Sequence, residues 1–125
     1  MSATWHAVHL VLQVHPDEPG PAGTLVVFEN VHVVRAASDK EARARGDALG
    51  REAELGGEGL EWDGRPARLV FAGVRKVVAC DPDDVPDGAL PEDGAEVTYG
   101  IYSFDEAAEL EAYLTGAPAR LRIED

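Results

Sequence analysis

Hydrophobic and polar residues alternate at the start of the chain, over residues 5–14. A period of two over this length predicts a half-buried β-strand. The residues expected on one face are Val8, Leu10, Leu12 and Val14, and those expected on the other are Trp5, Ala7, His9 and Gln13.

A segment rich in proline and glycine, residues 16–23, predicts a loop that leads to a second strand rich in valine. Asp63-Gly64 is a strong signal for a two-residue hairpin between two later strands. Gly73 indicates a bulge or bend within the longer of these strands. The strands expected after the first are 24–36, 60–62, 65–80, 96–102 and 120–123.

Two capping boxes predict where helices begin. Ser38 and Glu41 form the first, and the helix after it carries small side chains that would let it lie close to a sheet. Ser103 and Glu106 form the second, and Gly116 ends the helix that follows. The stripe expected to face the sheet in the first helix is Ala42, Gly46, Leu49 and Ala53.

The order of these elements predicts one α+β domain over residues 1–125. We expect a mainly antiparallel sheet of four to six strands with two helices packed on one face. A more strongly curled, partly open barrel is the alternative. The chain has one cysteine, no start typical of a signal peptide and no apolar run of about 20 residues. These features favour a soluble cytoplasmic protein.

The 24 acidic and 11 basic residues give a net charge of −13. Such a balance argues against nucleic acids and anionic membranes as partners, because both need a concentrated positive surface. Solubility alone could explain the charge. The more specific interpretation is complementarity to a basic protein partner.

Short motifs along the chain resemble the bacterial domain-of-unknown-function 4288 family over roughly residues 4–102. Residues 103–125 do not match the core pattern of that family. The resemblance implies the fold but no catalytic or binding residue, because the family has none assigned. The motifs are Trp5-x-Ala7-Val8, Val33-Val34-Arg35-Ala36 leading to Ser38-x-x-Glu41-Ala42, Trp62-Asp63-Gly64, Phe71-x-Gly73-Val74 and Asp93-Gly94-Ala95-Glu96-Val97-x-Tyr99.

Candidates for metal binding or catalysis are weak. His6, His9, His15 and His32 fall in the first two strands, and His9 and His32 could approach on one face if those strands pair. Zinc sites usually show a regular ligand spacing, which is missing here. Cys80 borders an acidic loop, which does not favour a reactive thiolate. We therefore expect no metal, no cofactor and no catalytic residue.

The acidic loop 81–93 departs from a calcium-binding loop because Val85 and Pro86 occupy positions that need a ligand and a glycine. We expect this loop to be solvated and to contribute to a protein-binding surface. Trp62 beside its tight turn is either a lid on the core or a recognition anchor. The residues of the predicted surface are Asp83, Asp84, Asp87, Glu92, Asp93 and Trp62.

Three functions follow from these observations, with a non-enzymatic protein favoured. The first is an acidic binding module for a basic partner, for example an immunity or antitoxin-like protein. The second is a homo-oligomeric scaffold joined through an exposed strand, such as residues 25–34 or 119–123. The third is a small-ligand binder or modest enzyme with a pocket between sheet and helix.

Overall fold

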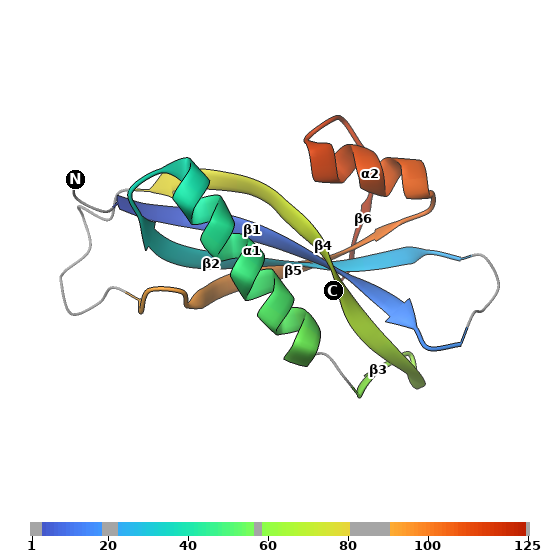
Figure 1. Ribbon diagram of the computed structural model, residues 1–125. Helices are drawn as coiled ribbons and strands as arrows, with labels where there is room; N and C mark the ends of the chain where they lie inside the picture. The colour runs from blue at the N-terminus through green and yellow to red at the C-terminus, as the bar shows by residue number, and fades with distance from the viewer. Residues whose placement is uncertain (1–3, 19–22, 57–58, 81–90, 125) are drawn as a thin grey trace.

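Six strands form one antiparallel sheet in the order β3-β4-β1-β2-β5-β6, so the first strand lies inside the sheet (Figure 1). The strands are β1 (Thr4–Pro16), β2 (Leu25–Ala36), β3 (Leu60–Trp62), β4 (Arg65–Cys80), β5 (Glu96–Phe104) and β6 (Arg122–Glu124). The helices are α1 (Asp39–Gly56) and α2 (Ala107–Thr115). This computed structural model describes residues 4–18, 23–56, 59–80 and 91–124. The predicted α+β class and antiparallel sheet are confirmed.

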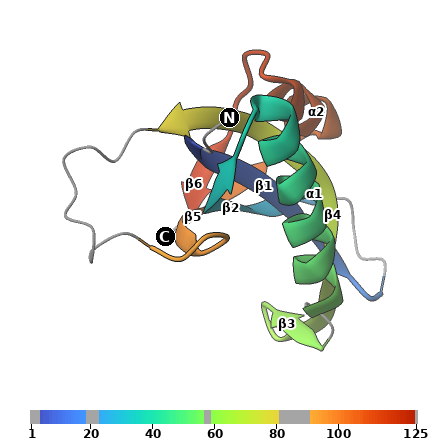
Figure 2. The same cartoon turned by 60° about the vertical axis from the view of Figure 1, so that its left-hand side comes forward.

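The sheet is curled, as the alternative prediction anticipated, and β4 bends along its length (Figures 1 and 2). Trp62 in β3 packs edge-on against Phe28 in β2, with 5.6 Å between the ring centroids. β4 and β1 lie between these two strands, which would be about 14 Å apart in a flat sheet. Gly73, with a φ of 136°, lies where the register between β1 and β4 shifts. The predicted bulge at Gly73 is therefore confirmed.

The two helices cover opposite faces of the sheet. α1 packs on the face of β1 that carries Val8 and Leu10, both fully buried. α2 packs through Leu110 on the face that carries Val11, which is also fully buried. Successive strand residues point to opposite faces, so both faces of β1 are covered. The expectation that both helices lie on one face is wrong, because Val11 makes the second face of β1 apolar as well.

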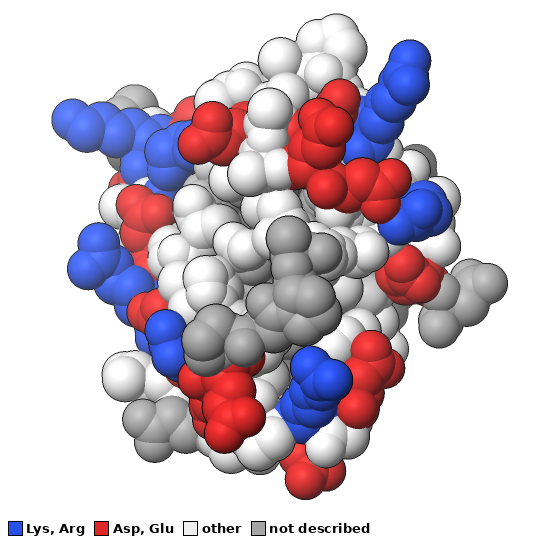
Figure 3. All heavy atoms as spheres, turned by 90° about the vertical axis from the view of Figure 1, so that its right-hand side faces the viewer, with Lys and Arg blue, Asp and Glu red and all other residues white. Residues whose placement is uncertain are grey.

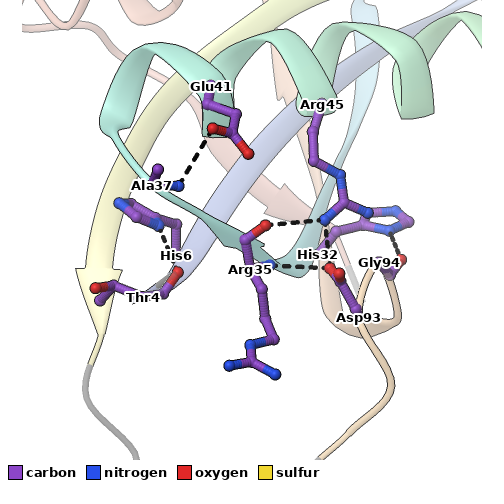
Figure 4. Close-up of polar contacts among 9 residues, drawn as sticks. All are labelled: Thr4, His6, His32, Arg35, Ala37, Glu41, Arg45, Asp93 and Gly94. Atoms are coloured by element: carbon purple, nitrogen blue, oxygen red, sulfur yellow. Dashed lines mark hydrogen bonds and ion pairs between the residues drawn. The ribbon is translucent and has the colours of Figure 1, made fainter. Parts of the chain in front are cut away.

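The first predicted capping box is present at the start of α1 (Figure 4). The hydroxyl of Ser38 accepts a hydrogen bond from the amide of Glu41, at 3.1 Å. The Glu41 carboxylate reaches back to the amide of Ala37, at 3.4 Å. These bonds satisfy amides that a helix start leaves without intrahelical partners.

The second predicted capping box does not form. Ser103 lies within β5, where its hydroxyl donates to Glu124 of β6 at 2.6 Å. α2 begins later, with Glu106 at its N-cap and no capping side chain there. The physical reason is the next residue, Phe104, whose ring is fully buried and keeps the strand extended past Ser103. Gly116 ends α2 in the left-handed conformation, as predicted.

Residues 25–34 do not form an exposed sheet edge, contrary to the expectation for an oligomeric scaffold. They belong to β2, which pairs with β1 on one side and β5 on the other. The short strand β6, residues 122–124, does lie at an edge. None of the helices in the described part of the chain is long and apolar enough to cross a membrane.

Replacing Gly50 with alanine tests how closely α1 approaches the sheet. A Cβ atom there would lie 2.2 Å from the Phe71 ring. We expect Gly50→Ala to lower the free energy of unfolding by about 1–2 kcal/mol, because overpacking outweighs the gain of about 1 kcal/mol in helix propensity. Urea denaturation measures this change.

The variant Phe71→Leu provides the control for that prediction. Its shorter side chain leaves room for the new methyl group, so the two substitutions combined should cost less than the sum of their separate effects. A gain in stability for Gly50→Ala alone would show that the helix does not lie so close to Phe71.

Candidate functional site

The structure describes three of the six residues predicted to form a binding surface. Asp83, Asp84 and Asp87 fall within residues 81–90, outside the described parts of the chain. The members that the structure places are Glu92, Asp93 and Trp62.

Trp62 lies apart from Glu92 and Asp93. Asp93 bonds to Arg35, near the end of β2. Trp62 packs against Phe28, which precedes Arg35 by about 23 Å along the same strand at a rise of about 3.3 Å per residue. The structure therefore brings Glu92 and Asp93 to one end of the sheet and Trp62 to the other.

The hollow beside Trp62 carries charged side chains of both signs, Glu18 and Asp63 together with Arg65. The half-buried side chain of Trp62 lines this open hollow beside the ends of β1 and β2. Viewed from this end of the molecule, charged side chains of both signs surround a mostly uncharged area (Figure 3). The lining residues that frame Trp62 include Val14, Leu25, Val26 and Arg65.

Asp93 is held in place by two arginines from different elements (Figure 4). Its carboxylate accepts a hydrogen bond from the backbone amide of Arg35, at 2.9 Å, and another from the guanidinium of Arg45 in α1. The same guanidinium donates to the carbonyl oxygen of Arg35, at 3.1 Å. The amide of Arg35, followed by the guanidinium of Arg45, lowers the pKa of the Asp93 carboxyl below its ordinary value. Asp93 is thus an anchor between α1, β2 and the segment before β5.

The residues after Asp93 strengthen this anchor through their backbone. The amide of Gly94 donates to the carbonyl of Val33 at 2.7 Å, and the amide of Val33 donates to the carbonyl of Ala95 at 3.0 Å. The ring of His32 donates from Nδ1 to the carbonyl of Gly94, at 2.9 Å (Figure 4). These bonds continue the pairing of β5 with β2, so they fix the place from which Glu92 projects into solvent.

Asp93→Ala should reduce the free energy of unfolding by about 1 kcal/mol at neutral pH, because two donors lose an acceptor that is partly exposed to solvent. Folding lowers the pKa of Asp93, so its stabilising contribution is present above its ordinary pKa of 3.8 and is lost as the pH falls through the folded value. The difference between wild type and variant should therefore shrink below about pH 4. Urea denaturation across a pH series measures it.

The neighbouring substitution Glu92→Ala is the matched control. Glu92 is exposed, so its removal should change stability by less than about 0.5 kcal/mol at any pH. A loss in Asp93→Ala that stays the same from neutral to acid pH would contradict the role assigned to the Asp93 carboxylate.

The histidines occupy separate places. His32 lies opposite Val8 in the ladder between β1 and β2, and His9, the residue after Val8, points to the other face. The expectation that His9 and His32 approach on one face is therefore wrong. His6 lies 3.2 Å from Asp39 through its Nε2 atom. Within the described ranges, no three His, Cys, Asp or Glu side chains come together as a metal site.

Glu29 is the centre of a buried polar cluster between β2 and α2. It is 6% exposed, and both of its carboxylate oxygens have partners. Nδ1 of His9 donates to one oxygen at 2.7 Å, and the hydroxyl of Tyr113 donates to the other. The guanidinium of Arg75 lies over the Tyr113 ring, 4.0 Å from its centroid, and donates to the Tyr113 carbonyl at 3.0 Å.

This cluster attaches α2 to the sheet. Burial raises the pKa of the Tyr113 hydroxyl, and the accepting Glu29 carboxylate raises it further. The hydroxyl therefore stays protonated and keeps donating to Glu29. The sequence did contain a signal for this cluster, since Glu29 is a charged residue between Val27 and Val31, which share its side of β2.

Negative charge is concentrated in the C-terminal part of the chain. Residues 77–119 contain 11 acidic residues and no lysine or arginine, which accounts for most of the net charge of −13. Their described part includes β5, on the far side of β2 from β1 and β4, and α2, which packs back over the sheet against β4. We call four exposed carboxylates of this region, before, on and just after β5, the acidic edge. They are Glu92, Glu96, Asp105 and Glu106.

The basic residues lie mainly on the opposite side of the sheet. Of the 11 lysines and arginines, four belong to β4 or its start and four to α1, which packs against β4. Basic residues therefore gather on α1 and β4, although α1 also carries five acidic residues, and the segment without lysine or arginine contributes β5 and α2. The basic residues of α1 and β4 are Lys40, Arg43, Arg45, Arg51, Arg65, Arg68, Arg75 and Lys76.

The acidic edge and the Asp93 anchor are described from the structure of this chain alone. No protein-family model, curated protein or solved structure matches the chain.

Proposed function

We propose that the protein is a non-enzymatic binding module whose acidic edge engages a basic protein partner. The observation that carries the proposal is the composition of residues 77–119, which hold 11 acidic residues and no lysine or arginine. An excess of one charge on a surface speeds the encounter with a partner of the opposite sign and disfavours wrong partners. Within the acidic edge, Asp105 is itself paired with Arg122 of β6, at 2.6 Å. An immunity or antitoxin-like protein that neutralises a basic toxin is a specific form of this proposal.

The anchor at Asp93 supports the proposal. Arg45 and the amide of Arg35 hold Asp93, and the backbone of Gly94 pairs with β2. Glu92 and Glu96, on either side of these bonds, therefore start from a fixed backbone. A pre-ordered surface loses less conformational freedom on binding than a flexible one.

The hydrogen bonds of the serine and histidine side chains favour a non-enzymatic role. Ser38 caps α1, and Ser103 donates to Glu124. His9 bonds to Glu29 and His32 to a backbone carbonyl. A nucleophile needs an adjacent base that is free to accept its proton, and these groups serve other partners.

The proposal includes a bacterial origin and the cytoplasm as the working compartment. A single cysteine suits a reducing environment. The resemblance of residues 4–102 to the domain-of-unknown-function 4288 family belongs to the same proposal, and it adds no site residue.

Two variants with equal net charge test the proposal. In the first, the acidic edge is neutralised by Glu92→Gln, Glu96→Gln, Asp105→Asn and Glu106→Gln. In the second, four exposed acids elsewhere are neutralised by Asp17→Asn, Glu18→Gln, Glu52→Gln and Glu61→Gln. Both changes bring the net charge from −13 to −9, so any difference between them reports position and not total charge.

The measurement is quantitative capture from lysate of the native host at low and high salt. Wild type and the second variant should retain the same basic protein in stoichiometric amount at low salt, whereas the acidic-edge variant should lose it by about tenfold or more. High salt should weaken capture by wild type. Equal capture by both variants, or no basic partner with any of them, would refute the proposal.

A further inference from the structure

The first half of β5 is exposed on both of its faces. Residues 96–99 are all exposed, although the β2 residues opposite them, 30–32, are half-buried. Val97 is 48% and Tyr99 61% exposed. Valine, threonine and tyrosine favour strands because their side chains pack on a pleated surface. Here they form such a surface, but no described element covers it.

The outer edge of this half-strand also lacks a partner within the described ranges. β5 pairs with β2 along its inner edge. β6 pairs with the outer edge only at residues 101–103. Alternate residues of a strand direct their backbone groups to the same side, so residues 96–100 present amides and carbonyls away from β2.

The opposite edge of the sheet is partly satisfied by side chains of α1. β3 pairs with β4 only at residues 65–67. Beyond that point Glu54 accepts the amide of Phe71 at 3.2 Å, and Arg43 donates to the carbonyl of Val74 at 2.9 Å. Side chains that satisfy edge groups, together with bulges, prevent a further strand from adding. The two edges therefore differ: α1 side chains bond two backbone groups of the β4 edge, at Phe71 and Val74, whereas no such bond reaches the outer edge of residues 96–100 in the described structure.

We propose that the outer edge of β5, residues 96–100, takes up an extended lysine- or arginine-bearing segment of a partner protein as an additional strand. This inference rests on the proposed function, and it names the way in which the basic partner binds. Main-chain hydrogen bonds to β5 would supply affinity, as in other cases of strand addition. The aliphatic stems of basic residues would cover Val97 and Tyr99, whose ring also attracts cations.

Charge identifies this occupant over a second copy of the chain. Glu92 and Glu96 flank the open edge, and no lysine or arginine lies between residues 77 and 119. Antiparallel pairing of two such edges would bring four carboxylates into one small interface. Like charges opposite one another destabilise paired strands. A basic strand would instead place positive charges opposite Glu92 and Glu96, so that repulsion becomes attraction.

The test uses two peptides of about nine residues, a usual strand length, with alternating lysine and valine. In one of them, the amides along one edge are N-methylated, which keeps the charge but removes the donors for strand pairing. Fluorescence anisotropy with the full chain should show that the unmodified peptide binds at least about tenfold more tightly at low salt. Backbone amide shifts in the NMR spectrum should centre on residues 96–100.

Two substitutions at one position separate backbone from side-chain effects. Val97 lies at the register shift where Glu96 pairs with His32 and Thr98 with Val31, so proline there spares those pairs. Val97→Pro should weaken peptide binding by about tenfold, whereas Val97→Thr, which keeps the amide, should stay within about threefold of wild type. The comparison of the two peptides on wild type needs no variant, and it stands even if Val97→Pro does not fold.

Two kinds of result would overturn the addition of a basic strand to β5. Equal binding of both peptides, or no binding of either, would overturn strand addition. A dimer of wild type in light scattering that Val97→Pro abolishes would overturn it in favour of a second copy. The proposed function is judged separately by the capture experiment, so a basic partner that Val97→Pro still retains would leave that function intact and refute only this binding mode.

Discussion

The structure depends on the double burial of β1. This strand is paired along both edges, with β2 and β4, and it is covered on both faces. Val8 and Leu10 lie beneath α1, and Val11 lies beneath α2, all without exposed surface. Full burial of each such side chain contributes about 1.5–3 kcal/mol. β1 therefore sets the plane of the sheet and requires a helix on each side of it.

This constraint explains which parts of the fold the sequence predicts. The alternation in β1, the Asp63-Gly64 turn and the bulge at Gly73 are local signals, and the structure has each of them. Asp63 and Gly64 both have positive φ, 53° and 75°, as this type of hairpin turn requires. The opposite placement of the helices depended on Val11, a fully buried apolar residue on the face that also carries His9 and Gln13. One such residue marks a second buried face.

The two capping boxes show that a local sequence motif does not always decide where a helix begins. Ser38 and Ser103 carry similar motifs, but only Ser38 begins a helix. At Ser103, pairing with β2 and burial of Phe104 outweigh the cap. A cap contributes about 1 kcal/mol, less than the burial of a large aromatic side chain. Tertiary packing therefore decided the outcome.

Only part of the candidate site could be predicted from the sequence. An acidic surface that includes Glu92 follows from composition, but the anchor does not, because Arg35 and Arg45 precede Asp93 by 58 and 48 residues. Nor does composition reveal where the segment without lysine or arginine lies. Strand order places β5 on the opposite side of the central pair from β4, whereas α2 packs back against β4.

The proposed binding mode depends on a difference between the two sheet edges, namely whether their outward backbone groups have hydrogen-bond partners. Native-state amide hydrogen exchange tests it most directly, since it reports each backbone donor in turn. We expect the amide of Phe71, bonded to Glu54, to be protected, and the outward-facing amides of residues 96–100 to exchange almost as fast as those of an unfolded peptide. Protection of all amides in residues 96–100 to the level of β1 would contradict the claim that the β5 edge is open.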